Sequence, residues 1–125
     1  MPDLNLFLAH YGYFAIFGLL VLGIVGPLIP DETIAIEDSN WSHRKEVLDS
    51  AVQFAKEGGK LVKLEFPKTE IQVYGFTAVL YSNFSYELEI GGQHSNHSGR
   101  VTEVFVLRKG QWVNPGWHMD SGKQN

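Results

Sequence analysis

The sequence contains no cysteine, which excludes a disulfide, a thiolate zinc site and a cysteine nucleophile. It also lacks an excess of basic residues, because 10 Lys and Arg stand against 14 Asp and Glu. The net charge is −4 and the pI is about 5.7. Proteins that bind nucleic acids usually carry a basic stripe for the phosphates, so we expect no nucleic-acid partner. A chain of 125 residues has room for one domain with a short appendage.

Charge is also missing from the first quarter of the chain. No charged residue occurs from Leu4 to Pro30, and this run is longer than the roughly 20 residues that cross a bilayer as a helix. We predict a membrane helix over residues 4–25, and a core helix that covers the sheet as a lid is the alternative. The run lacks the polar stripe that a lid needs, which favours the membrane. Arg44 and Lys45 follow it and favour a cytoplasmic C-terminal part. A soluble cytoplasmic protein is the alternative localisation.

The middle of the chain predicts a strand, a helix and another strand. Thr33 to Glu37 is a short β-type run, and Ser42 is a candidate N-cap for a helix from His43 to about Glu57. Lys60 to Phe66 alternates between apolar and charged residues, as a half-exposed strand does. Pro67 interrupts it, which predicts a sheet edge or a bulge.

The last fifty residues predict antiparallel strands joined at Tyr74-Gly75, at Gly91 to His94 and at Lys109-Gly110. In these registers Ser82 lies opposite Glu103. All three turns place the same residues on one face, namely Ile71, Val73, Ala78, Leu80, Phe84, Tyr86, Val101, Phe105, Leu107 and Trp112, with Ser82, Glu103, Asn114 and His118 among them. An apolar surface with a few convergent polar groups is typical of a small-molecule pocket. The predicted fold is therefore α+β, with a curved antiparallel sheet, one packed amphipathic helix and an N-terminal apolar helix.

The stretch FLAHYGYFAIFGLLVLGIVGPLIPDETI resembles the start of DedA-type membrane proteins. In those proteins a first apolar helix runs into a segment rich in Gly and Pro that ends in an acidic residue, as Gly26, Pro27, Pro30 and Asp31 do here. The resemblance covers the first quarter of the chain and implies a membrane segment without transport activity. We divide the chain into residues 1–31, a possible anchor or replacement lid, and a domain over residues 32–125.

Residues 32–125 resemble SnoaL-like domains of the nuclear transport factor 2-like superfamily. The similar stretches are IEDSNWSHRKEVLD, EIQVYGFTAVLYSNFSYELEIGG and SGRVTEVFVLRKGQWVNPGWHMDSGK. The resemblance implies a bent sheet that wraps around N-terminal helices as a cone, with the pocket inside. It departs at the front, where the DedA-like segment replaces those helices. A natural fusion, a truncated domain with an anchor and a junction between two genes all fit this pattern.

Glu103, His118 and Asp38 are the candidate catalytic residues. Glu103 is predicted to face inward as a general base, with His118 diagonally near it, and Asp38 is expected at the rim. Each also has a structural interpretation, as a hydrogen-bonded carboxylate, a core histidine and a turn residue. The candidate ligand-binding residues are Trp41, Leu80, Ser82, Phe84, Tyr86, Phe105, Trp112 and Asn114.

His94 and His97 suggest a metal, but no third ligand is evident, so we predict neither a metal nor another cofactor.

The opposite face of the predicted sheet is too apolar to be fully solvated. It carries Val79, Tyr81, Val104, Val106, Val113, Pro115, Trp117 and Met119. A second copy of the same sheet is the simplest cover, so we expect a homodimer through this outer face.

Two functions remain open at this stage. The favoured one is a binding module for a small apolar or aromatic molecule, with residues 4–25 as its membrane attachment. The alternative is an isomerase, cyclase or dehydratase that uses an acid/base pair in the cone.

Overall fold

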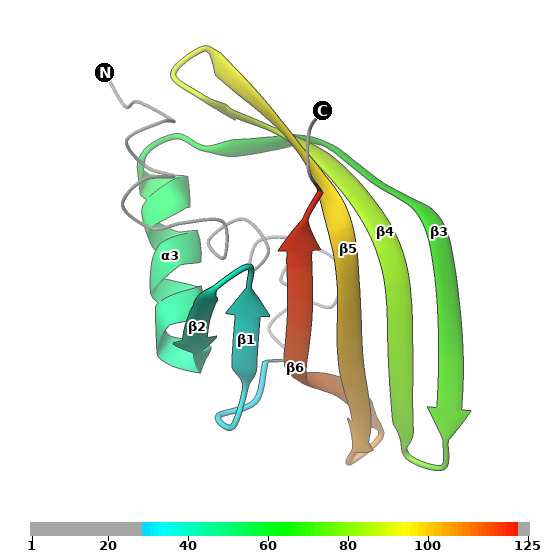
Figure 1. Ribbon diagram of the computed structural model, residues 1–125. Coiled ribbons are helices and arrows are strands. Elements are labelled where there is room, and N and C mark those ends of the chain that lie inside the picture. Colours follow the sequence, from blue (N-terminus) through cyan, green and yellow to red (C-terminus); the bar gives the residue numbers. More distant parts are fainter. Residues whose placement is uncertain (1–28, 123–125) are drawn as a thin grey trace.

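The computed structural model describes residues 29–122 (Figure 1). The elements are β1 (Ile34–Glu37), β2 (Asn40–His43), α3 (Arg44–Lys56), β3 (Lys60–Tyr74), β4 (Thr77–Ile90), β5 (Gln93–Arg108) and β6 (Gln111–Ser121). The predicted apolar helix over residues 4–25 lies outside the described residues, as does nearly all of the segment assigned to residues 1–31. Within residues 29–122, no helix has the length and apolar character needed to span a bilayer.

The strands form one mixed sheet in the order β2-β1-β6-β5-β4-β3. The four strands from β3 to β6 are long, curved and antiparallel, as the sequence predicted (Figure 1). The short strand β1 pairs with β6 in parallel, and β2 pairs with β1 as an antiparallel edge strand. Neither the strand β2 nor the pairing of β1 with β6 was predicted from the sequence.

The core lies between α3 and the sheet face that we call the inner face. Its buried apolar residues come from both layers and are Ile29, Ala35, Val47, Phe54, Phe84, Tyr86, Leu88, Ile90, Val101, Trp117 and Met119. The helix begins at Arg44, one residue later than predicted, and Glu46 Oε1 accepts a hydrogen bond from the His43 backbone N–H at 3.1 Å. At its end Gly58 adopts φ 77°, and Gly59 N–H donates to Phe54 O, which ends the helix as a Schellman motif.

The hairpin turns are tight, and each uses residues with positive φ. Gly91 and Gly92 have φ of 56° and 81°, and Lys109 and Gly110 have φ of 50° and 77°, as two-residue type I′ turns require. The β4–β5 turn is therefore two residues long, not four as predicted. The register moves by two residues, so Leu80 pairs with Glu103 instead of Ser82. A shift of two keeps every side chain on its predicted face.

One extra residue in β6 changes the sheet more than the turns do. Val106 pairs with Val113, but Val104 pairs with Gly116, so Asn114 and Pro115 together face a single residue of β5. Such a bulge reverses the facing of everything beyond it. Beyond this bulge Trp117 and Met119 are buried on the inner face, and their predicted place on the outer face is wrong.

The opposite edge of the sheet is β3. Its register with β4 shifts between Glu65 and Lys68, which confirms the edge or bulge that Pro67 predicted.

Candidate functional site

The main polar contact on the inner face joins β5 to the bulge in β6. Asn114 Nδ2 donates a hydrogen bond to Glu103 Oε1 at 3.1 Å, and both side chains are buried. Asn114 Oδ1 accepts from the Gly116 backbone N–H at 3.1 Å. Thr33 Oγ1 donates to the Asn114 carbonyl at 3.2 Å. The bulge therefore fixes the amide that orients the Glu103 carboxyl, and the predicted sharing of a face by Glu103 and Asn114 is confirmed.

Burial raises the pKa of Glu103 to about 7, although the hydrogen bond from Asn114 opposes the shift. A carboxyl group with such a pKa changes its charge near neutral pH. It can take up or release a proton there, which an exposed glutamate cannot do efficiently.

Aromatic side chains continue along β4, four and six residues beyond Leu80, the cross-strand partner of Glu103. Phe84 and Tyr86 are buried and stack with ring centroids 5.6 Å apart. Tyr86 also stacks on His97 at 5.1 Å. Burial lowers the pKa of His97, which favours its neutral form. Phe84 and Tyr86 therefore belong to the buried core of the inner face, further along the sheet than Glu103.

Leu80, Phe105 and Trp112 lie on the inner face towards the end of the sheet that α3 does not cover. Leu80 is the cross-strand partner of Glu103, and Trp112 pairs with Leu107. Trp112 remains 38% exposed. Ser82 is buried on the same face, but its hydroxyl contacts Thr69 Oγ1 at 2.7 Å and the Lys68 carbonyl at 2.9 Å. It therefore joins β4 to the irregular part of β3.

His118 does not join this group. Because of the bulge it pairs with Thr102 and lies on the outer face, where its Nε2 is 3.5 Å from an Asp120 oxygen. The prediction that His118 shares a face with Glu103 is wrong. The predicted register did not include the bulge at Asn114-Pro115, where two residues of β6 face one residue of β5.

Asp38 and Trp41 also lie away from the Glu103 cluster. Asp38 has φ 55° in the β1–β2 turn, and its carboxylate accepts hydrogen bonds from Ser121 N–H and Oγ at 2.7 and 2.8 Å. These contacts hold the end of β6, as a turn residue does. Trp41, a candidate ligand-binding residue, pairs with Ile36 and is 71% exposed on the outer face, away from the other candidates.

Glu37, the most deeply buried carboxyl group on the inner face, was not among the residues predicted from the sequence. Glu37 is 1% exposed, and Trp117 Nε1 donates to its Oε1 at 3.4 Å. Trp117 is in turn the cross-strand partner of Glu103, so it lies between the two carboxyl-bearing strands. Alternation in the run Ile34 to Glu37 was the available signal, because it places Glu37 on the same face as Ala35.

A family model described as a SnoaL-like domain matches residues 29–119. The chain belongs to this SnoaL-like family. No curated protein matches it. The match covers the bulge, both buried glutamates and the aromatic residues of β4, and it confirms the SnoaL-like resemblance predicted from the sequence. The resemblance of the first residues to DedA-type proteins is not shown by these comparisons.

Solved structures share the fold of this SnoaL-like domain. A candidate calcium/calmodulin-dependent kinase II association domain from Exiguobacterium sibiricum is 11% identical, with a TM-score of 0.71 over 100% of this chain and 98% of the other. A nuclear transport factor 2-like protein from Cytophaga hutchinsonii is 16% identical, with a TM-score of 0.65 over 98% and 100%. A superfamily protein from Salmonella enterica is 19% identical, with a TM-score of 0.64 over 95% and 88%.

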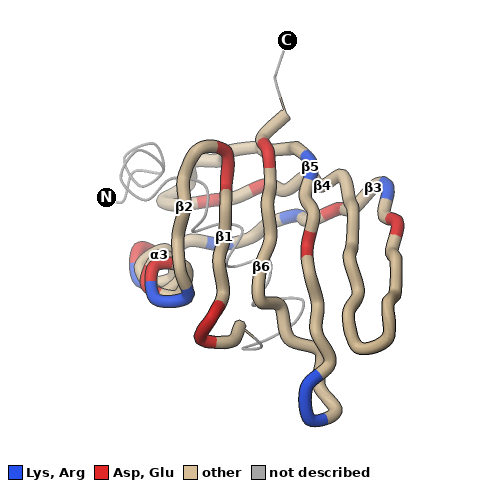
Figure 2. The backbone as a smooth tube through the Cα atoms, turned by 60° about the horizontal axis from the view of Figure 1, so that its bottom comes forward, with Lys and Arg blue, Asp and Glu red and all other residues tan. Residues whose placement is uncertain are grey.

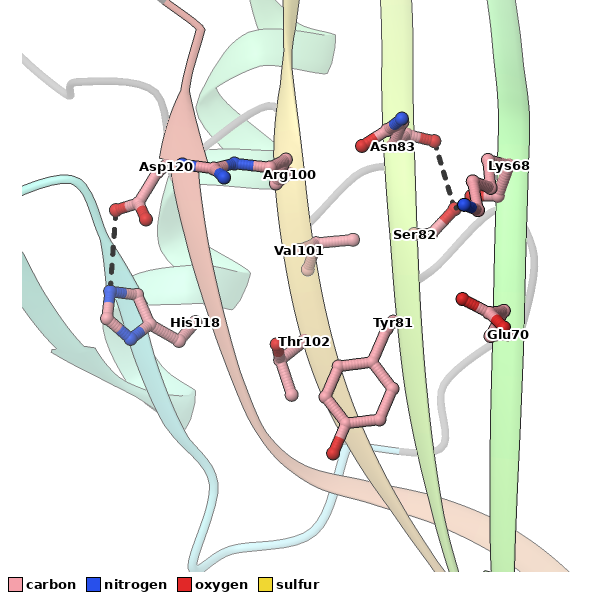
Figure 3. A pocket seen from close by; sticks show the side chains of 10 residues that line it. All are labelled: Lys68, Glu70, Tyr81, Ser82, Asn83, Arg100, Val101, Thr102, His118 and Asp120. Carbon is pink, nitrogen blue, oxygen red and sulfur yellow. Dashed lines mark hydrogen bonds and ion pairs between the residues drawn. The ribbon is translucent and has the colours of Figure 1, made fainter.

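The outer face of the SnoaL-like domain carries a groove of about 540 Å³. Figure 3 shows its side chains in rows across β3 to β6, with Tyr81 and Thr102 in the middle and charged residues around them. Arg100 and Asp120 are cross-strand partners here, beside His118. The groove is shallow and polar, unlike the buried inner face.

No group of three or more His, Asp and Glu suited to a metal occurs within residues 29–122. His94 Nδ1 lies 2.8 Å from Glu87 Oε2, whereas His97 stacks on Tyr86 and contacts Ser95. The two histidines of the β4–β5 hairpin therefore have different partners.

Proposed function

We propose that this SnoaL-like domain binds a small apolar or aromatic molecule on its inner face, against Glu103. The observation that carries the proposal is the buried Glu103–Asn114 pair, which shares the inner face with the partly exposed side chains of Leu80, Phe105 and Trp112. A buried ionisable group costs folding free energy. A buried ionisable group on an apolar face is typical of ligand sites.

The test is a titration of the protein with small aromatic compounds, followed through the indole N–H signals of its tryptophans in NMR spectra. Glu103→Leu should weaken binding, because it removes the polar group while it keeps an apolar side chain. Glu70→Leu on the exposed strand β3 is the matched control and should bind as the wild type does. If all compounds fail to bind, or if both variants bind equally, the ligand site is wrong.

An enzymatic role of the isomerase type is the second candidate, and the pKa of Glu103 near 7 favours it. Glu103 would act as the base that removes a proton from the carbon next to a carbonyl group. Exchange of the methyl protons of acetophenone for deuterium in D₂O measures this step directly. Catalysis would be supported if exchange is faster than in buffer and if Glu103→Gln abolishes this excess. If acetophenone binds but its protons do not exchange, the isomerase proposal is wrong.

We also propose that the outer face pairs with a second copy of the chain. Apolar side chains on this face remain exposed: Ile34 by 44%, Trp41 by 71% and Tyr81 by 45%. Arg100 and Asp120 add charges of both signs that two identical faces can match. Light scattering should give a dimer, and Tyr81→Arg should dissociate it, whereas Lys109→Glu in the β5–β6 turn should not. A wild-type monomer at high concentration would contradict the proposal.

A further inference from the structure

One row of side chains crosses the whole outer face. Successive cross-strand pairs connect one residue from each strand, in the order Trp41, Ile36, His118, Thr102, Tyr81 and Glu70. We call these residues the outer row. Trp41 stands at the β2 end of the row and is 71% exposed. The groove of about 540 Å³ lies towards the other end, and it is lined by the last four members of the row.

The two ends of the outer row match in shape and chemistry. At the β3 end, Tyr81 and Glu70 are cross-strand neighbours within the groove (Figure 3). An indole ring can stack on a tyrosine, and its N–H group can donate to a carboxylate. Trp41 cannot reach these two residues in its own copy, because neighbouring strands are about 4.8 Å apart and β4 and β3 are the fourth and fifth strands from β2. Trp41 can therefore meet this end of the groove only in a second copy.

Charge complementarity decides how the second copy is turned. A two-fold axis across the strands would place each strand over its own copy, whereas an axis along the strands exchanges the two edges of the sheet. The one acid of β5 is Glu103 on the inner face, so the first arrangement gives Arg100 no carboxylate on the strand that it faces. An axis along the strands, between β5 and β6 in the middle of the sheet, places these two strands over each other. Arg100 and Asp120 lie side by side there (Figure 2), so each Arg100 then faces the partner's Asp120.

We infer that two copies pack about this second axis, so that Trp41 of each copy fills the outer groove of the other. The axis places β2 over β3 and β1 over β4, which brings the partner's Trp41 to Tyr81 and Glu70. The inference rests on the proposed dimer and adds its orientation and its anchor residue. It also gives a role to an exposed tryptophan that the inner-face site leaves unused.

Substitution of Trp41 measures its weight in the dimer. Trp41→Ala should raise the dissociation constant of the full-chain dimer about thirtyfold, the usual effect of removing an aromatic anchor from an interface. Phe76→Ala is the matched control, because Phe76 is also aromatic and is 72% exposed but lies in the β3–β4 turn, outside the outer row. It should leave the dissociation constant unchanged. Sedimentation over a series of protein concentrations measures both variants.

Cross-linking tests the orientation, and the chain suits it because it contains no cysteine. His43 and Gln72 follow Trp41 and Glu70 by two residues on the same face, so the inferred axis places the partner's His43 opposite Gln72. A bismaleimide that spans roughly 10 Å, the distance between packed sheets, can join cysteines there but not across one copy. The double variant His43→Cys/Gln72→Cys should give covalent dimers, and each single variant should not.

The contrary results separate the orientation from the dimer itself. If the wild type is a dimer but Trp41→Ala dimerises equally well, the role of Trp41 as the anchor is overturned while the dimer stands. Covalent dimers of His43→Cys alone would overturn the inferred axis, because β2 would then lie over its own copy. If the wild type is a monomer at every concentration, the proposed dimer falls and the inference falls with it.

Discussion

Replacement of Glu103 by Gln should change how the stability of the domain depends on pH. The folded state raises the pKa of Glu103 from 4.5 to about 7 because the side chain is buried. Between these values the folded protein keeps a proton that the unfolded chain has released. The contribution of Glu103 to the unfolding free energy is therefore largest below pH 4.5 and declines as the pH rises to about 7.

The size of the effect follows from the shift. Each pKa unit corresponds to about 1.4 kcal/mol, so a shift of roughly 2.5 units gives about 3 kcal/mol. Glutamine imitates the protonated carboxyl and keeps an oxygen that can accept from Asn114 Nδ2. Glu103→Gln should therefore gain about 3 kcal/mol relative to the wild type between pH 4 and pH 8.

Urea denaturation at a series of pH values, followed by tryptophan fluorescence, measures the difference between the two proteins. Glu37 also raises its pKa on folding, but it is present in both proteins and its contribution cancels in the difference. Glu70→Gln, on the exposed part of β3, is the control and should follow the wild type at every pH. A pH-independent difference between Glu103→Gln and the wild type would refute the assignment of Glu103 as a buried neutral acid.

Three further predictions concern packing and the apolar segment. Phe54→Ala should destabilise the domain by about 3–5 kcal/mol in urea denaturation, because Phe54 is 1% exposed in the core. The control Phe76→Ala, at a residue that is 72% exposed, should change the unfolding free energy little. Equal effects of the two substitutions would contradict the place of Phe54 in the core. Gly99→Ala should lower the melting temperature strongly, because a Cβ atom there would collide with the Asp120 carbonyl, whereas at Gly122 the nearest atom is 3.3 Å away and alanine should be tolerated. In a flotation assay, residues 4–25 should carry the full chain into the liposome fraction. A version that starts at Ile29 is the control and should stay in solution. A full chain that also stays in solution would disprove the membrane interpretation.

The sequence was sufficient to predict which residues of β3 to β5 face inward, even though two turns were misplaced. One is the turn at Gly91 to His94, and the other is the turn expected at Tyr74-Gly75, where Tyr74 instead pairs with Thr77. The stretch Gly91 to His94 fits both a two-residue and a four-residue loop, and period-two alternation cannot distinguish registers that differ by two. The turn at Lys109-Gly110 was placed correctly, and Leu107 pairs with Trp112 as predicted. Side-chain facing was thus predicted more reliably than the pairing of individual residues.

The bulge in β6 was missed although its signal was present. Proline inside a strand indicates an edge or a bulge, a rule that correctly identified the irregularity at Pro67. The same rule at Pro115 would have predicted the extra residue, and with it the outward position of His118.

The parallel pairing of β1 with β6 joins residues about eighty positions apart. Local pattern does not encode this contact. Alternation along β1 places Glu37 on the same face as Ala35, but the burial of that face depends on the pairing with β6.

The bulge at Asn114-Pro115 also affects how this strand should be compared between relatives. A homologue with one residue fewer at this point would present the counterpart of His118 to the ligand and the counterpart of Trp117 to the exterior. Insertion or deletion of a single codon could thus exchange the chemistry of the binding surface while the fold is preserved. An alignment that places its gap a few columns away would equate residues from opposite sides of the sheet. Catalytic assignments should be transferred along β6 only between relatives whose bulges coincide.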